Sequence, residues 1–206
     1  MTNGFYLQNF LYLYSRNKHV IMENTRIKLS ETVMVIDAAY LNFVINDLKK
    51  YFEPLLGRSL QRADLALFTM CLAMDAGVKE GSNDVQILLV YDEQSGKLED
   101  CLPSDLKSEL DGMAFKGPLG DLLHIVLNSA EVKKLIVVPF NEEYGEEVEN
   151  VLKESVVESA GQKGNAKDIV FFRMEKPVTP VAYRWEILGY PLMSALGIRS
   201  GDLQNN

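Results

Sequence analysis

The chain has 206 residues and a formal net charge of −8, and 47% of its residues are hydrophobic while 24% are charged. These values are typical of a globular domain and exclude a wholly disordered chain. The acidic excess repels nucleic acids at long range, which disfavours RNA as a partner without excluding a local basic groove. No apolar run reaches the ~20 residues of a membrane span. The two cysteines form no disulfide framework. We therefore expect a cytoplasmic protein that does not enter a membrane.

The first 22 residues differ from the rest of the chain because aromatic side chains crowd together there: Phe5, Tyr6, Phe10, Tyr12 and Tyr14. The only charged residues in this segment are Arg16 and Lys18. A signal peptide would carry its positive charge ahead of the apolar stretch rather than after it. Three interpretations stay open: an appendage, a translated leader ahead of Met22, and a membrane-touching segment. We expect a single α/β domain over residues 23–206.

The first half of the chain predicts two buried strands separated by two helices. Glu31–Asp37 and Val85–Tyr91 are apolar on both faces, as are the buried strands of parallel sheets. An amphipathic pattern after the first strand predicts a helix that ends near Pro54 and Gly57. Ala63–Ala76 is apolar almost all round, which predicts a deeply packed helix.

The second half continues the alternation of helices and strands. Its predicted elements are, in chain order, a helix from Ser104 through Leu110, a loop over 112–120, a strand over Leu135–Val138, a helix over Tyr144–Val156 and a strand over Asp168–Arg173. The segment Leu122–Leu127 between the loop and the strand fits a helix or a strand, and we favour a helix. The tail predicts a helix that starts after Thr179 with Pro180 at its first position, breaks at Gly189, and resumes through Leu196. Together these elements predict a three-layer α/β fold with a mostly parallel sheet of about four or five strands and helices on both faces.

Acidic residues follow the predicted strands. Asp37 ends the first strand, Asp92 follows the second, and Glu143 follows the third. Because the carboxyl ends of parallel strands meet at one edge of a sheet, we expect these carboxylates to share that edge. Converging carboxylates repel one another unless a divalent cation neutralises them, and Mg²⁺ or Mn²⁺ would also activate water against a phosphodiester. Asp37 and Asp92 are the predicted metal ligands, and Asp64 at a helix start completes the set of candidate catalytic residues.

The same acids have a structural interpretation, which the sequence alone favours. A carboxylate just after a strand and before a helix accepts hydrogen bonds from the first helical amides and stabilises the positive end of the helix, by roughly 0.3–1 kcal/mol. We expect helix capping for Asp37, Asp64, Asp92 and Glu143, with the metal site as the alternative.

The run VMVIDAAYLN at 33–42, followed by ADLAL at 63–67, resembles the start of PIN-like, NYN-type ribonuclease domains. Those domains open with a strand that ends in Asp, with an Asn nearby, and continue with a "DVALAVD"-like helix and a "SGDSDF"-like strand end. Asp37 and Asp64 match the first acids of the first two motifs, whereas Asn42 comes later than the family's Asn. Met70 stands where the second acid of the helix motif would be.

Two registers remain open for the third motif. Pro139–Tyr144 places Asn141 and Glu143 at its two aspartates and Tyr144 at its aromatic residue, whereas Asp84–Asp92 fits with a deletion. The resemblance, over roughly residues 32–175, implies a PIN/NYN-like or Rossmann-like architecture and metal-dependent RNA cleavage. The replaced acids imply weak metal binding, so a degenerate member is the leading interpretation.

Three functions follow as hypotheses. The first is a non-catalytic binding or assembly protein; the aromatic segment Val181–Met193 offers a partner surface, and we predict a stable homo-oligomer or another protein partner. The second is an active metal-dependent ribonuclease. The third is a small-molecule binder at the strand-end crevice. A group of basic residues is placed to flank the Asp37 edge in contact with RNA, although solvated helix faces explain it equally well: Lys49, Lys50, Arg58 and Arg62.

Overall fold

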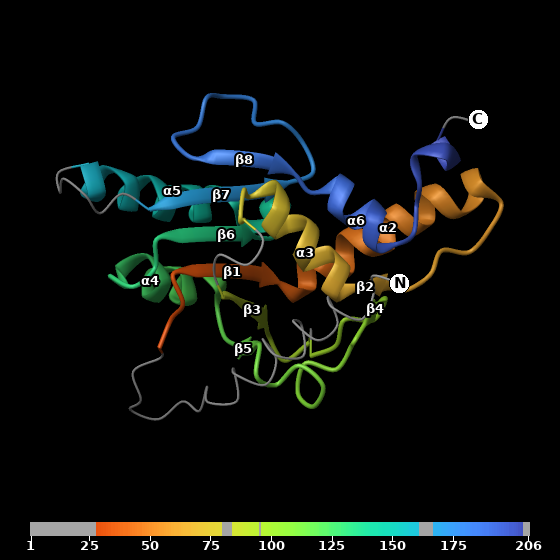
Figure 1. Cartoon of the computed structure of the whole chain (residues 1–206), viewed down its shortest axis with the longest axis horizontal. Helices are drawn as coiled ribbons and strands as arrows, with labels where there is room; N and C mark the ends of the chain where they lie inside the picture. The colour runs from red at the N-terminus through yellow and green to blue at the C-terminus, as the bar shows by residue number, and fades with distance from the viewer. Residues whose placement is uncertain (1–27, 80–83, 95, 161–166, 204–206) are drawn as a thin grey trace.

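The computed structural model describes residues 28–79, 84–94, 96–160 and 167–203, so the predicted appendage or leader at 1–22 lies outside the described residues. Within them, six parallel strands form one sheet in the order β5-β3-β1-β6-β7-β8, and the arrows of β1, β6, β7 and β8 point the same way in Figure 1. The strands are β1 (Thr32–Asp37), β3 (Val85–Tyr91), β5 (Ala114–Lys116), β6 (Lys134–Val138), β7 (Asp168–Arg173) and β8 (Arg184–Ile187).

The order of the strands places a topological switch point at the centre of the sheet. Numbered by their succession in this sheet, the strands lie in the order 3-2-1-4-5-6, which is the order of the Rossmann fold. The chain builds outward from β1 to β3 and β5, then returns to the centre and builds outward through β6, β7 and β8. Ligands of open α/β sheets bind beside the carboxyl ends of the strands at such a switch point, which here lies between β1 and β6.

Helices cover both faces of the sheet, so the predicted three-layer α/β fold is confirmed. Figure 1 shows α3 and α6 in front of the sheet and α4 and α5 behind it, while α2 leads away from the carboxyl end of β1. The helices are α2 (Ala38–Leu56), α3 (Leu65–Asp75), α4 (Leu119–Asn128), α5 (Asn141–Ala160) and α6 (Gly189–Ala195), with a 3₁₀ turn η1 (Ser200–Leu203). Two short strands, β2 (Ala63–Asp64) and β4 (Cys101–Leu102), pair separately.

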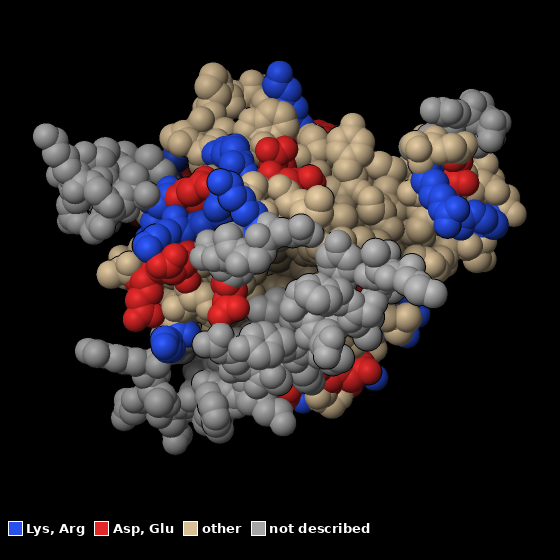
Figure 2. Space-filling model, in the orientation of Figure 1, with Lys and Arg blue, Asp and Glu red and all other residues tan. Residues whose placement is uncertain are grey.

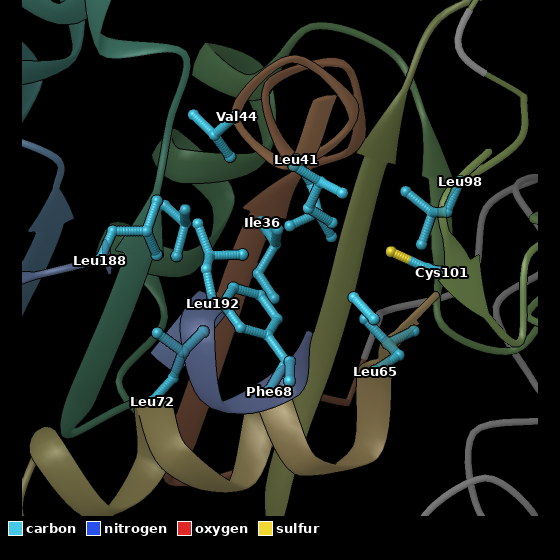
Figure 3. Close-up of a cluster of buried hydrophobic side chains, with 14 of the residues drawn as sticks. Ile36, Leu41, Val44, Leu65, Phe68, Leu72, Leu98, Cys101, Leu188 and Leu192 are labelled. Atoms are coloured by element: carbon cyan, nitrogen blue, oxygen red, sulfur yellow. The ribbon is translucent and has the colours of Figure 1, made fainter. Parts of the chain in front are cut away.

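The central strand β1 supplies side chains to two hydrophobic clusters, one on each face of the sheet. Met34 and Ile36 pack with residues of α2, α3 and α6. Val33 and Val35 pack with residues of α4 and α5. Figure 3 shows Phe68 of α3 and Leu192 of α6 beside Ile36 in the first cluster. Burial on both faces explains why β1 is a continuous apolar run, because each such side chain contributes roughly 1.5–3 kcal/mol when removed from water.

The predicted helix from Ser104 through Leu110 is wrong, because the structure has turns there. The carboxylate of Glu109 accepts hydrogen bonds from the backbone amides of Ser104 and Asp105, each at 2.9 Å. Asp105 in turn accepts from the amides of Lys107 and Ser108, at 2.9 and 3.0 Å. The amides of Glu109 and Leu110 both donate to the carbonyl of Asp105 at 3.0 Å, so the backbone closes a single turn that does not continue as a helix.

Two further differences enlarge the sheet from the predicted four or five strands to six. The helix predicted after Thr179 is wrong in its first part: Arg184–Ile187 is strand β8, and the helical part begins only at Gly189. Within the predicted loop 112–120, Ala114–Lys116 pairs with β3 as strand β5. Both added strands are short and lie at the two edges of the sheet, where only one neighbour sets their register.

The helix predicted over Ala63–Ala76 is present as α3 but is not packed all round. Leu65, Phe68 and Leu72 are buried in the cluster shown in Figure 3, whereas Met74 is 64% exposed. The apolar composition predicts burial of the whole surface of this helix. The sheet and α6 cover only part of it, so Met74 stays exposed.

Candidate functional site at the carboxyl edge of the sheet

The switch point is lined by the residues that follow β1 and β6. Asp37 is the last residue of β1, and α5 begins at Asn141, shortly after β6 ends at Val138. β1 and β6 are direct neighbours, so both connections leave the sheet at the same edge. We refer to this side of the molecule, where the strands end, as the carboxyl edge.

Asp37 is buried at this edge, and both of its carboxylate oxygens accept hydrogen bonds. It is the N-cap of α2: Oδ1 accepts from the backbone amide of Tyr40 at 2.8 Å. The hydroxyl of Tyr144 donates to Oδ2. Burial raises the pKa of the Asp37 carboxyl above its ordinary value, against the opposing effect of these hydrogen bonds, and the nearby charge of Asp92 raises it further.

Tyr144 reaches Asp37 from the first turn of α5. Its backbone departs from helical geometry, with φ −139° and ψ 28°, so that α5 has a kink at this residue. Burial raises the pKa of the Tyr144 hydroxyl, and the charge of Asp37 and its hydrogen bond raise it further. The hydroxyl therefore stays protonated and serves as a hydrogen-bond donor to the buried carboxylate.

A second tyrosine–carboxylate pair crosses the switch point in the opposite direction. The hydroxyl of Tyr40, a buried residue of α2, donates to Oε1 of Glu142 at 3.2 Å. Burial raises the pKa of Tyr40, and the charge of Glu142 adds to the effect. The β1–α2 connection and the start of α5 thus exchange two hydrogen bonds across the switch point, where such folds bind ligands.

Aromatic rings pack beside these pairs. The ring of Phe140 lies 5.1 Å from that of Tyr40, 5.2 Å from that of Phe43 and 6.3 Å from that of Tyr144, measured between centroids. These separations are typical of favourable aromatic pairs. Phe43 is the exposed member of the cluster and leads from the buried pairs to the surface of α2.

An open cleft of about 310 Å³ lies on that surface, and its lining residues are Asn42, Phe43, Asn46, Glu99 and Asp100. Asn42 joins the two walls, because its amide donates to the carbonyl of Lys97 at 2.7 Å and accepts from the amide of Glu99 at 3.0 Å. An ion pair between Lys49 and Asp100, at 2.7 Å, also links α2 to this loop. The segment after β3 is thereby fixed against α2, and the cleft is a feature of the folded domain.

The structure brings some of the sequence-predicted acids together and separates others. Asp37 and Asp92 share the carboxyl edge as predicted, since Asp37 pairs with Val90 in the parallel register and Asp92 lies beyond the end of β3. Asp92 is exposed, and its Oδ1 accepts from the amide of Gln94 at 2.8 Å. No helix directly follows β3 among the described residues, so the predicted capping role of Asp92 is wrong. Glu143 is exposed in the first turn of α5.

Asp64 has the capping role that the sequence favours. It is the N-cap of α3, and its Oδ1 accepts from the amide of Leu67 at 3.0 Å. It belongs to β2, which pairs with β4 outside the main sheet. Across the part of the chain that the structure describes, no three His, Cys, Asp or Glu side chains are grouped to hold a metal ion. The predicted ligands Asp37 and Asp92 therefore gain no third protein ligand there.

Sequence reasoning missed Tyr40 and Glu142 as partners at this edge. The hydrogen bond from the Tyr40 amide did have a local signal. Tyr40 lies three residues after Asp37, which is the usual spacing between an N-cap residue and an amide that donates to its side chain. Tyr144 was aligned with a family motif, but its contact spans 107 positions of the chain and has no local signature. The cleft residues Glu99 and Asp100 lie in a segment with no recognisable motif.

No curated protein and no solved structure matches the chain. Of the helices in the described ranges, none is both long and apolar enough to cross a membrane. A sequence model described as a family of unknown function, DUF6621, matches residues 26–122 and 119–203. These matches cover most of the chain, which therefore belongs to the DUF6621 family.

Proposed function

We propose that this protein is a degenerate PIN-like, NYN-type domain that acts by binding or assembly rather than by metal-dependent RNA cleavage. The observation that carries the proposal is the state of Asp37, whose two carboxylate oxygens already accept hydrogen bonds from the Tyr40 amide and the Tyr144 hydroxyl. A metal ligand of a nuclease needs an oxygen directed at the ion and at the water it activates. At this edge, the corresponding oxygens stabilise α2 and hold the start of α5.

The positions of the other acids support the same proposal. Asp64 is occupied as the cap of α3, and Met70 replaces the second acid of that family motif. Divalent cations of the Mg²⁺ type require several oxygen ligands in a near-octahedral arrangement. The carboxylates that the described residues offer are spread over separate turns, so a bound ion would depend mainly on water.

The distribution of basic residues also favours a partner other than RNA. Lys49 pairs with Asp100, Lys50 with Asp47 and Arg58 with Asp202, so three of the four cations expected to flank Asp37 have an acidic partner. Figure 2 shows basic and acidic side chains side by side on one face of the molecule. Lys134 and Asp168, the first residues of β6 and β7, form an ion pair. Binding to a phosphate backbone relies on an unbalanced basic surface.

The test is an RNA cleavage assay with single-stranded and structured substrates in the presence of Mg²⁺ or Mn²⁺. We expect the wild type to cleave no faster than the variant Asp37→Asn, and both to match a blank without protein. A matched control is Glu131→Gln, which alters an exposed acid just ahead of β6. Metal-dependent cleavage by the wild type that disappears in Asp37→Asn but persists in Glu131→Gln would contradict the proposal.

If the protein acts by assembly, we expect a stable homo-oligomer. Most large apolar side chains of the segment expected to form a partner surface pack inside their own domain, among them Tyr183, Leu188 and Leu192. Tyr190 is the exception and is 68% exposed. Light scattering at micromolar concentration checks the prediction, and a monomer would leave binding to another molecule as the surviving form.

A small-molecule binder is the second candidate, and the open cleft beside the carboxyl edge favours it. Its volume of about 310 Å³ lies at the lower end of the range of ligand sites, which suits a small group rather than a dinucleotide. The crevice that holds the pyrophosphate in nucleotide-binding members of this fold class starts from a glycine-rich turn, whereas the turn here is Ile36-Asp37-Ala38 and presents a carboxylate.

A further inference from the structure

The cleft on α2 combines an exposed aromatic ring with a negative charge. Phe43 is 42% exposed, and the ring of Phe140 lies 5.2 Å from its ring, measured between centroids. An exposed aromatic face attracts a cation through its quadrupole. The ring therefore offers a cation a place to stack.

The charges at the cleft select the sign of the ligand. Glu99 and Asp100 contribute two carboxylates, and Lys49 supplies one ammonium group that pairs with Asp100 at 2.7 Å. The lining thus carries a net negative charge, and Glu99 is exposed to solvent. Asp92, also exposed, follows β3 on the same segment of chain, whereas Glu93 there pairs with Lys116 at 2.8 Å and Lys97 adds one exposed positive charge. An anion such as a phosphate would be repelled, whereas a cation would gain an ion pair with Glu99.

The remaining lining residues favour a planar cation with several donors. Asn46 is exposed at the cleft and brings an amide oxygen, and Glu99 brings two carboxylate oxygens. Asn42 is already engaged on both ends of its amide and forms part of the wall. A guanidinium group stacks on aromatic rings, is weakly hydrated and presents five donors, whereas an ammonium group is a compact, strongly hydrated charge.

We propose that the cleft formed by Asn42, Phe43, Asn46, Glu99 and Asp100 binds the guanidinium group of an arginine side chain, with its plane on Phe43 and its donors directed at Glu99 and Asn46. This inference deepens the proposed binding function and rests on it. The small volume of the cleft fits one such side chain presented by a partner peptide.

The experiment is a titration followed by heteronuclear NMR, with N-acetyl-arginine amide as the probe. N-acetyl-citrulline amide is the matched control ligand, because it has nearly the same shape and carries no charge. We expect saturable shifts of the backbone amides of Asn42–Asn46 and Lys97–Asp100 with the arginine probe and much weaker shifts with citrulline. An arginine flanked by glycines in a short peptide should bind at least as well as the single residue.

Variants separate the two contacts. We expect Glu99→Gln and Phe43→Leu each to weaken binding roughly two- to fivefold, since one removes an exposed ion pair and the other a cation–π contact. Glu131→Gln should leave the affinity unchanged. Glu99 is exposed, so its variant keeps the fold, and thermal unfolding checks that Phe43→Leu does too.

Three results would overturn the inference: no shift at the cleft up to millimolar probe, equal binding of citrulline, or full affinity in Glu99→Gln. The proposed function is judged separately by the RNA cleavage assay. A cleft that fails to bind arginine in a protein without Asp37-dependent cleavage defeats only the inference. Cleavage that depends on Asp37 defeats the proposed function whatever the cleft binds.

Discussion

Asp37 is only 8% exposed. Its buried carboxylate is therefore stabilised mainly by the two hydrogen-bond donors that it contacts. The amide of Tyr40 is local and follows from the position of Asp37 between a strand and a helix. The hydroxyl of Tyr144 comes from the far side of the switch point. Together they replace the water that a carboxylate loses on burial, which otherwise costs several kcal/mol.

Removal of the Tyr144 hydroxyl should therefore destabilise the fold. In Tyr144→Phe, Oδ2 of Asp37 keeps its burial but loses its donor, and we expect the free energy of unfolding at pH 7 to fall by about 1–3 kcal/mol. Urea denaturation followed by circular dichroism measures the change. Tyr190→Phe is the control, because this tyrosine is 68% exposed and its loss should change stability by less than about 0.5 kcal/mol. Equal stabilities of the two variants would count against the hydrogen bond.

Asp37 also predicts a pH dependence of stability. Burial raises its pKa above the ordinary 3.8, so the folded protein binds this proton more tightly than the unfolded chain does. Its contribution to the free energy of unfolding is complete below pH 3.8 and is lost as pH rises through the folded-state pKa. Asp37→Asn keeps a capping side chain without this titration. We expect its free energy of unfolding, relative to the wild type, to increase as pH rises from below 3.8 to neutrality.

Asp202→Asn provides a control of opposite sign. Its carboxylate accepts a hydrogen bond from the amide of Arg199 and lies beside Arg58, and these contacts lower its pKa. The wild type gains this contribution as pH rises through the folded-state pKa and holds it in full above pH 3.8, so the stability of the variant relative to the wild type should decrease as pH rises towards 3.8. Denaturant titrations at several pH values give both slopes, and slopes of the same sign in the two variants would refute the assignment for Asp37.

At this scale the sequence predicted positions rather than contacts. The hydrophobic pattern around each residue predicts that Asp37 lies at a strand end and Asp64 at a helix start. The partners Tyr144 and Glu142 could not be predicted, because each lies more than 100 positions away from the residue that it contacts. A proximity of that kind depends on the crossover that sets β6 beside β1.

At the scale of elements, too, local patterns were predictable from the sequence and tertiary contacts were not. Buried strands such as β1 and β3 were predicted correctly, because continuous apolar runs need cover on both faces. Strand β8 was missed because it lies at an edge, and its charged residues Arg184 and Glu186 gave no buried pattern. Its strand conformation comes from parallel pairing with β7, which is a tertiary interaction.

The cap of α3 gives a prediction at this scale. Asp64→Ala removes the acceptor of the Leu67 amide, and we expect the free energy of unfolding to fall by about 0.5–2 kcal/mol. Asp64→Asn should restore most of the loss, because asparagine caps about as well as aspartate. Urea denaturation compares the three proteins. An asparagine variant as unstable as the alanine variant would show that the charge, rather than the capping geometry, matters.

For the whole molecule, the shared strand β1 links the two hydrophobic clusters. Ile36 belongs to one cluster and Val35 to the other, so neither can form without the same backbone. We expect the chain to unfold as one cooperative unit, consistent with the single domain predicted over residues 23–206. The only tryptophan, Trp185, lies on β8, so its fluorescence reports one edge of the sheet while far-ultraviolet circular dichroism reports the helices. The two midpoints should coincide, and separate transitions would divide the chain into independent units.

The sheet ends on one side in three residues of β5 and on the other in four residues of β8. Such short edge strands offer a strand of another molecule few backbone groups with which to pair. The charges of Arg184 and Glu186 disfavour pairing with β8 further. Growth of this sheet from copy to copy is therefore disfavoured. A homo-oligomer of this protein is expected to join through its helices or loops, and its solutions should resist fibre formation.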